Sequence, residues 1–158
     1  MINEFVIEGI DEANACFDNL KRELLNPKEP LKESAFFMRE EALRNFDEDG
    51  GAFGEPWAPL KDKTLEIKER EGYGGQPMMV RTEKLRSSFF VENPIITGDG
   101  GSSEVFNPTL YAINHQLGIG RNLPIRVLLK FAQVQRDNIT NIFFDWVVKK
   151  VRESFSNG

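Results

Sequence analysis

The stretch LRSSFFVENPIITGDGGSSEVF (residues 85–106) decides the fold class, because it concentrates the strand signals of the chain. Aromatic and β-branched residues gather at 89–91, 95–97 and 105–106, and such residues favour strands. The glycine-rich run 98–101 is typical of a hairpin turn. Apolar runs at 78–80, 111–113 and 123–129 extend the strand pattern on both sides. We therefore expect several antiparallel strands in the middle of the chain.

Helical patterns flank this stretch. Residues 11–25 and 31–45 each carry one apolar stripe, Pro30 suits a first helical turn, and a longer helix is expected at 137–155. Strands between helices indicate an α+β fold: a mostly antiparallel sheet packed with N-terminal helices and a long C-terminal helix. A length of 158 residues fits a single domain. We expect a helical part (1–48), a loop and sheet part (50–130) and the C-terminal helix (137–155).

The C-terminal helix carries two apolar stripes. The first is sufficient to dock the helix on the sheet and comprises Ile139, Ile142, Phe143, Trp146 and Val147. The second lies beside it and comprises Phe144, Val148, Val151 and Phe155. Either the N-terminal helices cover the second stripe, through Phe17, Leu20 or Phe36, or it is an interface. Our hypothesis is that part of it meets a neighbouring subunit, because exposed apolar patches mark interfaces.

The charge of the chain argues against a nucleic-acid partner. The net charge is −5, and residues 1–60 hold 14 acidic against 6 basic residues. Binding to a phosphate backbone needs clustered positive charge. A local basic cluster comprises Lys149, Lys150 and Arg152. The charge pattern therefore disfavours a nucleic-acid-contacting module.

Catalytic and metal-binding signals are weak. One cysteine, Cys16, and one histidine, His115, exclude a disulfide framework within the chain and multi-histidine metal cages. Neither a GxSxG elbow nor a nucleotide-binding glycine motif occurs. There is no apolar run long enough for a membrane helix, and the N-terminus lacks the basic start of a signal peptide. We expect no enzyme activity, no cofactor, no metal and no membrane partner; a small hydrolase using His115 is the third alternative.

Four sequence blocks occur in a familiar order. GEPWAPL (54–60), continued by Thr64, Leu65 and Lys68, matches G-x-P-W-x-P-L-x-x-x-T-L-x-x-K. RTEKLRSS (81–88) is similar to T-G-x-L-R-x-S, YAINHQLG (111–118) to Y-A-x-x-H-Q-x-G, and LPIRVLL (123–129) to I-P-x-R-P-F-L. Together the blocks resemble the phage virion morphogenesis family, which includes tail-completion proteins of temperate tailed phages.

The resemblance implies a structural assembly protein that acts in tail completion or head–tail joining. The alternative is a nucleic-acid-contacting module at the portal or packaging stage. The resemblance also implies other phage tail or neck proteins as partners, a homo-oligomeric ring, and a place in the virion or the assembling virion in the bacterial host cytoplasm. The family motif positions with structural roles are Trp57, Leu60, Leu85, Tyr111, His115, Gln116, Gly118, Pro124 and Arg126. Glu83 stands where the family has glycine, so we expect the backbone of that turn to differ.

Five motif residues carry expectations of their own. Trp57, between two prolines, is either a rigid interface anchor or a lid over the domain's own core. Arg126 lies in an apolar run, so its guanidinium needs a carboxylate or carbonyl partner. The polar groups of Tyr111, His115 and Gln116 are expected to bond to backbone beside the following turn, which makes His115 structural.

Overall fold

The computed structural model describes residues 9–98 and 100–156. Helices α1 (Ile10–Leu24) and α2 (Lys28–Asp47) open the chain, and α6 (Gln133–Ser156) closes it. Between them lie the single 3-10 turn η1 (Gly51–Phe53) and the helices α3 (Asp62–Arg70), α4 (Lys84–Ser87) and α5 (Ala112–Leu117). The strands are β1 (Phe90–Val91), β2 (Ile95–Thr97), β3 (Gly100–Ser102) and β4 (Val105–Phe106). The expected α+β fold is confirmed.

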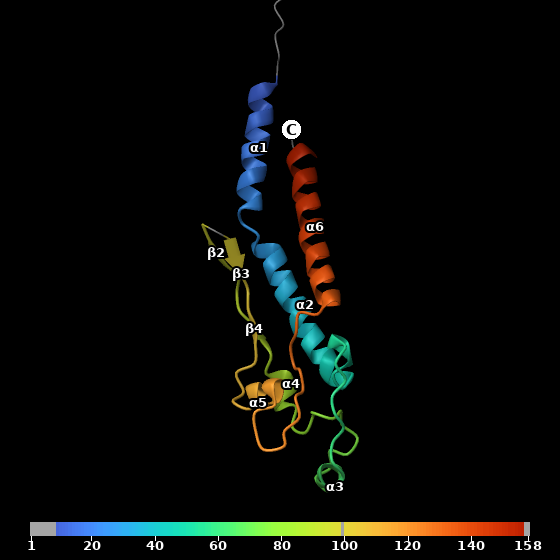
Figure 1. Cartoon of the computed structure of the whole chain (residues 1–158). Coiled ribbons are helices and arrows are strands. Elements are labelled where there is room, and N and C mark those ends of the chain that lie inside the picture. Colours follow the sequence, from blue (N-terminus) through green and yellow to red (C-terminus); the bar gives the residue numbers. More distant parts are fainter. Residues whose placement is uncertain (1–8, 99, 157–158) are drawn as a thin grey trace, which may run out of the picture.

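The molecule is elongated, with two differently built ends (Figure 1). At one end α1 runs beside the C-terminal part of α6. We call the two helices α1 and α6 together the arm. At the other end α3, α4 and α5 gather around the end of α2, and we call this part the body. Helix α6 packs along α1 and α2. The expectation that it docks on a sheet is therefore wrong: its neighbours are helices.

The strands pair antiparallel, as expected, in two separate two-stranded sheets. In one sheet β1 pairs with β4, with Phe90 opposite Phe106. In the other, β2 pairs with β3, with Ile95 opposite Ser102. Gly100 and Gly101 of the predicted hairpin turn belong to β3, and Asp99 lies outside the described residues. The hairpin at this position is confirmed.

Several predicted strands are wrong. Residues 78–80 form a turn, residues 84–87 form α4 ahead of β1, and residues 111–113 lead into α5. Residues 123–127 belong to no helix or strand, and residues 128 and 129 form a bend. An apolar run that is this short does not distinguish a strand from a buried loop or helix turn. Whether such a run becomes a strand depends on where its backbone N–H and C=O groups find hydrogen-bond partners.

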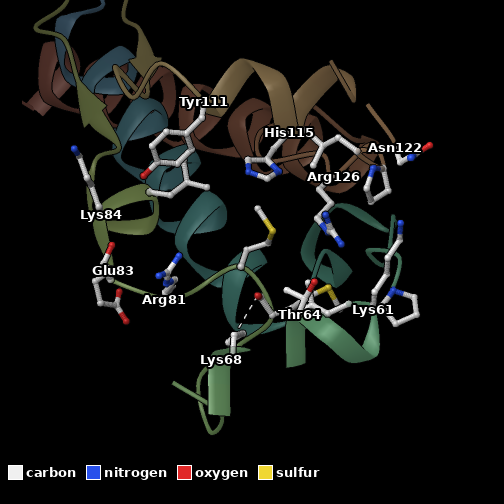
Figure 2. A pocket seen from close by; sticks show the side chains of 18 residues that line it. Lys61, Thr64, Lys68, Arg81, Glu83, Lys84, Tyr111, His115, Asn122 and Arg126 are labelled. Atoms are coloured by element: carbon white, nitrogen blue, oxygen red, sulfur yellow. Dashed lines mark hydrogen bonds between the residues drawn. The ribbon is translucent and has the colours of Figure 1, made fainter. Parts of the chain in front are cut away.

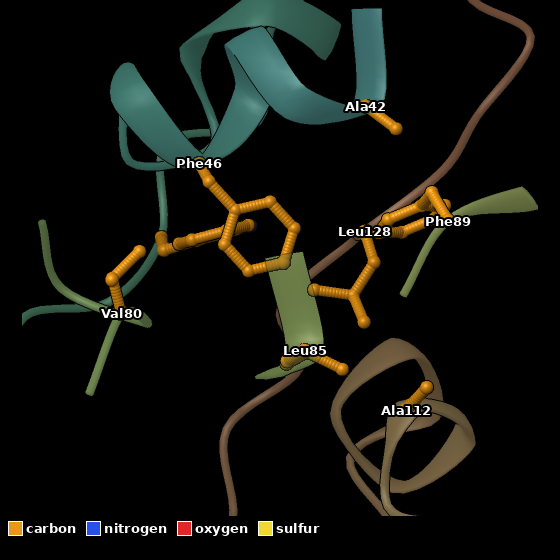
Figure 3. Close-up of a cluster of buried hydrophobic side chains, with 8 residues drawn as sticks. Ala42, Phe46, Val80, Leu85, Phe89, Ala112 and Leu128 are labelled. Atoms are coloured by element: carbon orange, nitrogen blue, oxygen red, sulfur yellow. The ribbon is translucent and has the colours of Figure 1, made fainter. Parts of the chain in front are cut away.

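The core lies in the body, under one face of α2 (Figure 3). Phe46 is fully buried, and its ring meets Trp57 edge-on at 5.3 Å and Phe89 at 6.1 Å between ring centroids. The other buried members are contributed by the loops and short helices: Val80, Leu85, Ala112 and Leu128, with Ala42 from α2. The predicted apolar face of α2 is confirmed, because Ala35, Met38, Ala42 and Phe46 are all buried.

A tight turn after α2 carries Trp57 back onto Phe46. Gly50 has φ +96° and its N–H bonds to the carbonyl of Asn45 at 2.8 Å. The Trp57 N–H then bonds to the carbonyl of Asp49 at 2.7 Å. A Cβ on Gly50 would lie 2.4 Å from the Glu55 carbonyl oxygen and 2.6 Å from the Trp57 ring. Only glycine fits this close approach.

We expect Gly50→Ala to lower the free energy of unfolding by about 3 kcal/mol, from backbone strain and overpacking together. Gly54→Ala is the matched control: Gly54 also has a positive φ, of 72°, but nothing lies within 4 Å of its Cβ position. That variant should lose about 1 kcal/mol. Urea unfolding measures both, and equal losses would contradict the role assigned to the close approach.

Candidate functional site

The four sequence blocks meet around one cavity in the body. It has a volume of about 590 Å³ and opens to solvent between α3, α5 and the segment that follows α5. Six of the motif residues line it: Leu60, Leu85, Tyr111, His115, Pro124 and Arg126. In Figure 2 Tyr111, His115 and Arg126 lie on one side of the cavity, and Thr64 and Lys68 lie on the opposite side. The structure thus brings together residues from all four blocks.

Arg126 is a buried cation at the cavity wall. Its residue is 5% exposed, and its Nη2 donates to the carbonyl of Ala58 at 3.1 Å. The expected carbonyl partner is therefore present. The Nε of Arg126 is buried without a hydrogen-bond partner. Burial lowers the pKa of Arg126, because it disfavours the charged form.

His115 and Gln116 occupy neighbouring positions of α5 with different outcomes. The Gln116 Oε1 accepts from the Leu128 N–H at 2.7 Å, and its Nε2 donates to the Leu129 carbonyl at 3.0 Å. For Gln116 the expected bonding to backbone is confirmed. The Nδ1 of His115 is buried without a partner, so for this imidazole nitrogen the expectation is wrong. The His115 ring instead meets Tyr111 edge-on at 6.3 Å.

Gly118 ends α5 and lets the closing segment approach. Its φ is +67°, and a Cβ there would lie 2.8 Å from Cγ1 of Ile125. Immediately after this contact, the N–H of Arg126 bonds to the carbonyl of His115 at 2.8 Å. The glycine therefore sets the register that places His115 and Arg126 on the same wall.

Lys68 is a buried lysine for which the sequence pattern predicted no role. It is 6% exposed, and its ammonium donates to the carbonyls of Gln76, Pro77 and Met78 at 3.1, 2.8 and 3.3 Å. These bonds hold the 76–78 turn against α3 at the floor of the cavity. Burial lowers the pKa of Lys68. The sequence feature that could have pointed to Lys68 is its position at the end of the first sequence block.

Trp57 belongs to the core. It is 5% exposed, and its indole N–H donates to the carbonyl of Val127 at 3.0 Å. Of the two roles left open by the sequence, the structure agrees with the lid over the domain's own core. The interface anchor would need an exposed ring, so that expectation is corrected. Leu85 is buried in the same cluster.

The second stripe of α6 lies on the arm. Phe144 and Phe155 are exposed, while Val148 and Val151 are half-buried. Phe17 of α1 contacts Phe155 edge-on at 6.0 Å between ring centroids, yet both rings remain exposed. Leu20 is half-buried and Phe36 is exposed. The N-terminal helices therefore cover the stripe only in part.

The rival functions gain little from this geometry. Lys149 pairs with Glu29 at 2.9 Å and Lys150 with Glu23 at 3.1 Å, so acidic partners face the basic cluster. Cys16 lies on the arm and its thiol contacts the Ser154 carbonyl at 3.2 Å, whereas His115 lies in the body. Across residues 9–98 and 100–156, no three His, Cys, Asp or Glu side chains gather as a metal site. No helix in those ranges is long and apolar enough to cross a membrane.

We expect the pKa of His115 to lie below its ordinary value of about 6.5, because burial and then the Arg126 charge disfavour the imidazolium. Between the lowered pKa and pH 6.5 the unfolded chain binds the proton and the folded chain does not. The free energy of unfolding should therefore fall as the pH drops through this window. Proton NMR of the single histidine measures the pKa. Urea unfolding at pH 7 and 5.5 should show a smaller loss in His115→Gln than in the original chain.

Glu83 keeps the backbone conformation that glycine favours. Its φ is +59° at the start of α4, so the expected change in this turn is corrected: the side chain differs and the left-handed backbone remains. Its carboxylate lies 3.7 Å from the Arg86 guanidinium in an exposed pair, which contributes little.

Two substitutions at Glu83 separate the backbone from the side chain. Glu83→Gly and Glu83→Ala both remove the carboxylate, but only glycine relieves the left-handed strain. We expect the glycine variant to exceed the alanine variant by about 1 kcal/mol in free energy of unfolding. An alanine variant of equal or greater stability would contradict the strain.

Comparison with known proteins addresses the identity of the chain. No curated protein and no solved structure matches it. A family model described as the phage virion morphogenesis family matches residues 9–148 of the 158. The match spans α1, α2, the whole body and most of α6. The chain therefore belongs to the phage virion morphogenesis family.

Proposed function

We propose that this chain is a structural, non-enzymatic protein of tail completion or head–tail joining. Its family ties it to phage virion assembly and to contact with other phage virion proteins. Within that role we propose that it forms a homo-oligomeric ring and contacts tail or neck proteins. The virion or the assembling virion is the place where such contacts are made.

The observation that carries the proposal is the incomplete packing of the arm. Helix α1 has no buried residue along its whole length, although it packs along α6. Phe17 is 57% exposed, Phe144 is 64% exposed and Phe155 is 58% exposed. A helix pair normally buries its apolar stripes against further helices. The arm therefore has apolar surface left for another subunit.

A second copy is the simplest source of those helices. Homo-oligomers repeat one contact around a symmetry axis, and a ring results when the rotation closes. Pairing of arms would cover Phe144 and Phe155 with the same kind of side chain from a neighbour. The body, with its cavity, would stay at the other end of each subunit and face other virion proteins.

Particles made without the protein test the assembly role. If it completes tails or joins them to heads, electron micrographs should show full heads beside unjoined or overlong tails. Expression of the protein in the same cells should restore joined particles. Normal infectious particles in its absence would refute the proposal.

Charged substitution tests the arm. Phe144→Asp places a carboxylate at an exposed apolar position, so we expect a folded chain that no longer self-associates. Asn138→Asp is the control, because it adds the same charge at an exposed polar position of the same helix. Light scattering reports self-association and circular dichroism reports folding. Loss of self-association in both variants, or in neither, would contradict the proposed interface.

A further inference from the structure

The cavity in the body is basic, although the chain is acidic. The net charge of the chain is −5, yet the cavity wall holds five cationic side chains and one carboxylate. The cations are Lys61, Lys68, Arg81, Lys84 and Arg126, and the carboxylate is Glu83. A concave site lined by one sign of charge focuses its field on ligands of the opposite sign.

Some of these charges already have partners. Arg81 pairs with Glu71 at 2.6 Å, and the three carbonyls described above occupy the Lys68 ammonium. Glu83 faces Arg86, not the cavity cations. Among the described residues no carboxylate pairs with Lys61, Lys84 or Arg126. The cavity therefore keeps an uncompensated positive charge.

The buried donor is the strongest sign of a missing ligand. Arg126 is 5% exposed, has a carbonyl and not a carboxylate as its partner, and leaves its Nε without a hydrogen bond. A buried cation normally has a counter-charge, because its desolvation is costly. The unpartnered Nδ1 of His115 lies on the same wall (Figure 2). An anion in the cavity would supply the counter-charge that the chain does not.

Apolar side chains also line the cavity, and they narrow the chemistry of the ligand. Leu60, Met78, Met79, Leu123 and Pro124 contribute side chains to the wall. A cavity of about 590 Å³ with both cationic and apolar side chains in its wall suits an apolar group as well as an anion. A phosphate backbone offers no apolar group at this position, and the net charge of −5 opposes its approach. A peptide carboxylate beside an apolar side chain fits both parts of the lining.

We propose that this cavity binds a peptide carboxylate flanked by an apolar side chain, supplied by another protein of the virion, with Arg126 as its principal donor. Lys61, which lies on the same side of the cavity as Arg126 (Figure 2), holds the carboxylate from the rim, and the two methionines contact the apolar side chain. The identity of the donor as a virion protein rests on the proposed function. The recognition chemistry rests on the cavity alone.

Methionine methyl NMR of the isolated chain tests the proposal. Met78 and Met79 line the cavity, whereas Met38 is a buried residue of α2 outside the cavity lining and serves as an internal control. The probes are acetyl-Leu-Glu-Leu-amide, its Gln counterpart, acetyl-Leu-Leu with a free carboxylate, and sodium phosphate. We expect the Glu peptide to shift the Met78 and Met79 methyls and to bind at least about tenfold more tightly than the Gln peptide.

Two further readouts separate carboxylate binding from simple apolar contact. The bound carboxylate should raise the pKa of His115, because an adjacent negative charge favours the imidazolium. Lys61→Gln should weaken binding of the Glu peptide about threefold. Lys63→Gln, at an exposed position of α3 away from the cavity lining, should leave it unchanged. Neither substitution touches the core, so both variants should fold.

Each outcome of the binding experiments either supports or overturns the proposal. Tighter binding of the free-carboxylate peptide would support the proposal and identify a chain terminus as the source; tighter binding of the Glu peptide would identify an acidic side chain. Equal affinity for the Glu and Gln peptides would overturn the proposal. Shifts with phosphate but not with the Glu peptide would also overturn it in favour of a phosphate site. These results are independent of particle assembly, so either proposal can fail without the other.

Discussion

The two hydrogen bonds accepted by the carbonyl of Val127 hold the segments of the body together. It accepts from Nδ2 of Asn45 at 2.8 Å and from the Trp57 indole at 3.0 Å. A buried carbonyl left without a donor would cost about 1–3 kcal/mol. These two bonds tie α2, the loop after it and the closing segment together, and Gln116 holds the next two residues. In this segment, side chains supply the backbone hydrogen bonds that a neighbouring strand would supply in a sheet.

That arrangement also creates the cavity and concentrates the core at one end. The closing segment approaches α5 through the Arg126–His115 backbone bond, so a guanidinium and an imidazole share one wall. The aromatic cluster of Phe46, Trp57 and Phe89 lies in the body, and Trp146 is a separate buried ring on α6. The arm has no comparable cluster, because α1 buries none of its residues. The body thus has a packed core of its own, while the arm leaves apolar side chains exposed.

Much of the fold was predictable where one pattern ran long enough. The apolar face of α2, the long helix at the C-terminus and the hairpin around residues 95–102 were all found, because their periodicity or turn chemistry is local. The carbonyl partner of Arg126 and the backbone bonds of Gln116 followed from the rule that buried polar groups need partners. The four blocks also led to the family that the comparison confirms.

The sequence by itself determined the helices, the hairpin and the family, because each is written in neighbouring or regularly spaced residues. Tertiary structure alone decided the short apolar runs, since residues 123–129 have the composition of a strand but find their partners in side chains up to 82 positions away. It decided that Trp57 lies in the core and that α6 packs on helices. It also gathered five cations around one cavity in an acidic chain. Charge spread along a sequence becomes a site only when folding brings it together in space.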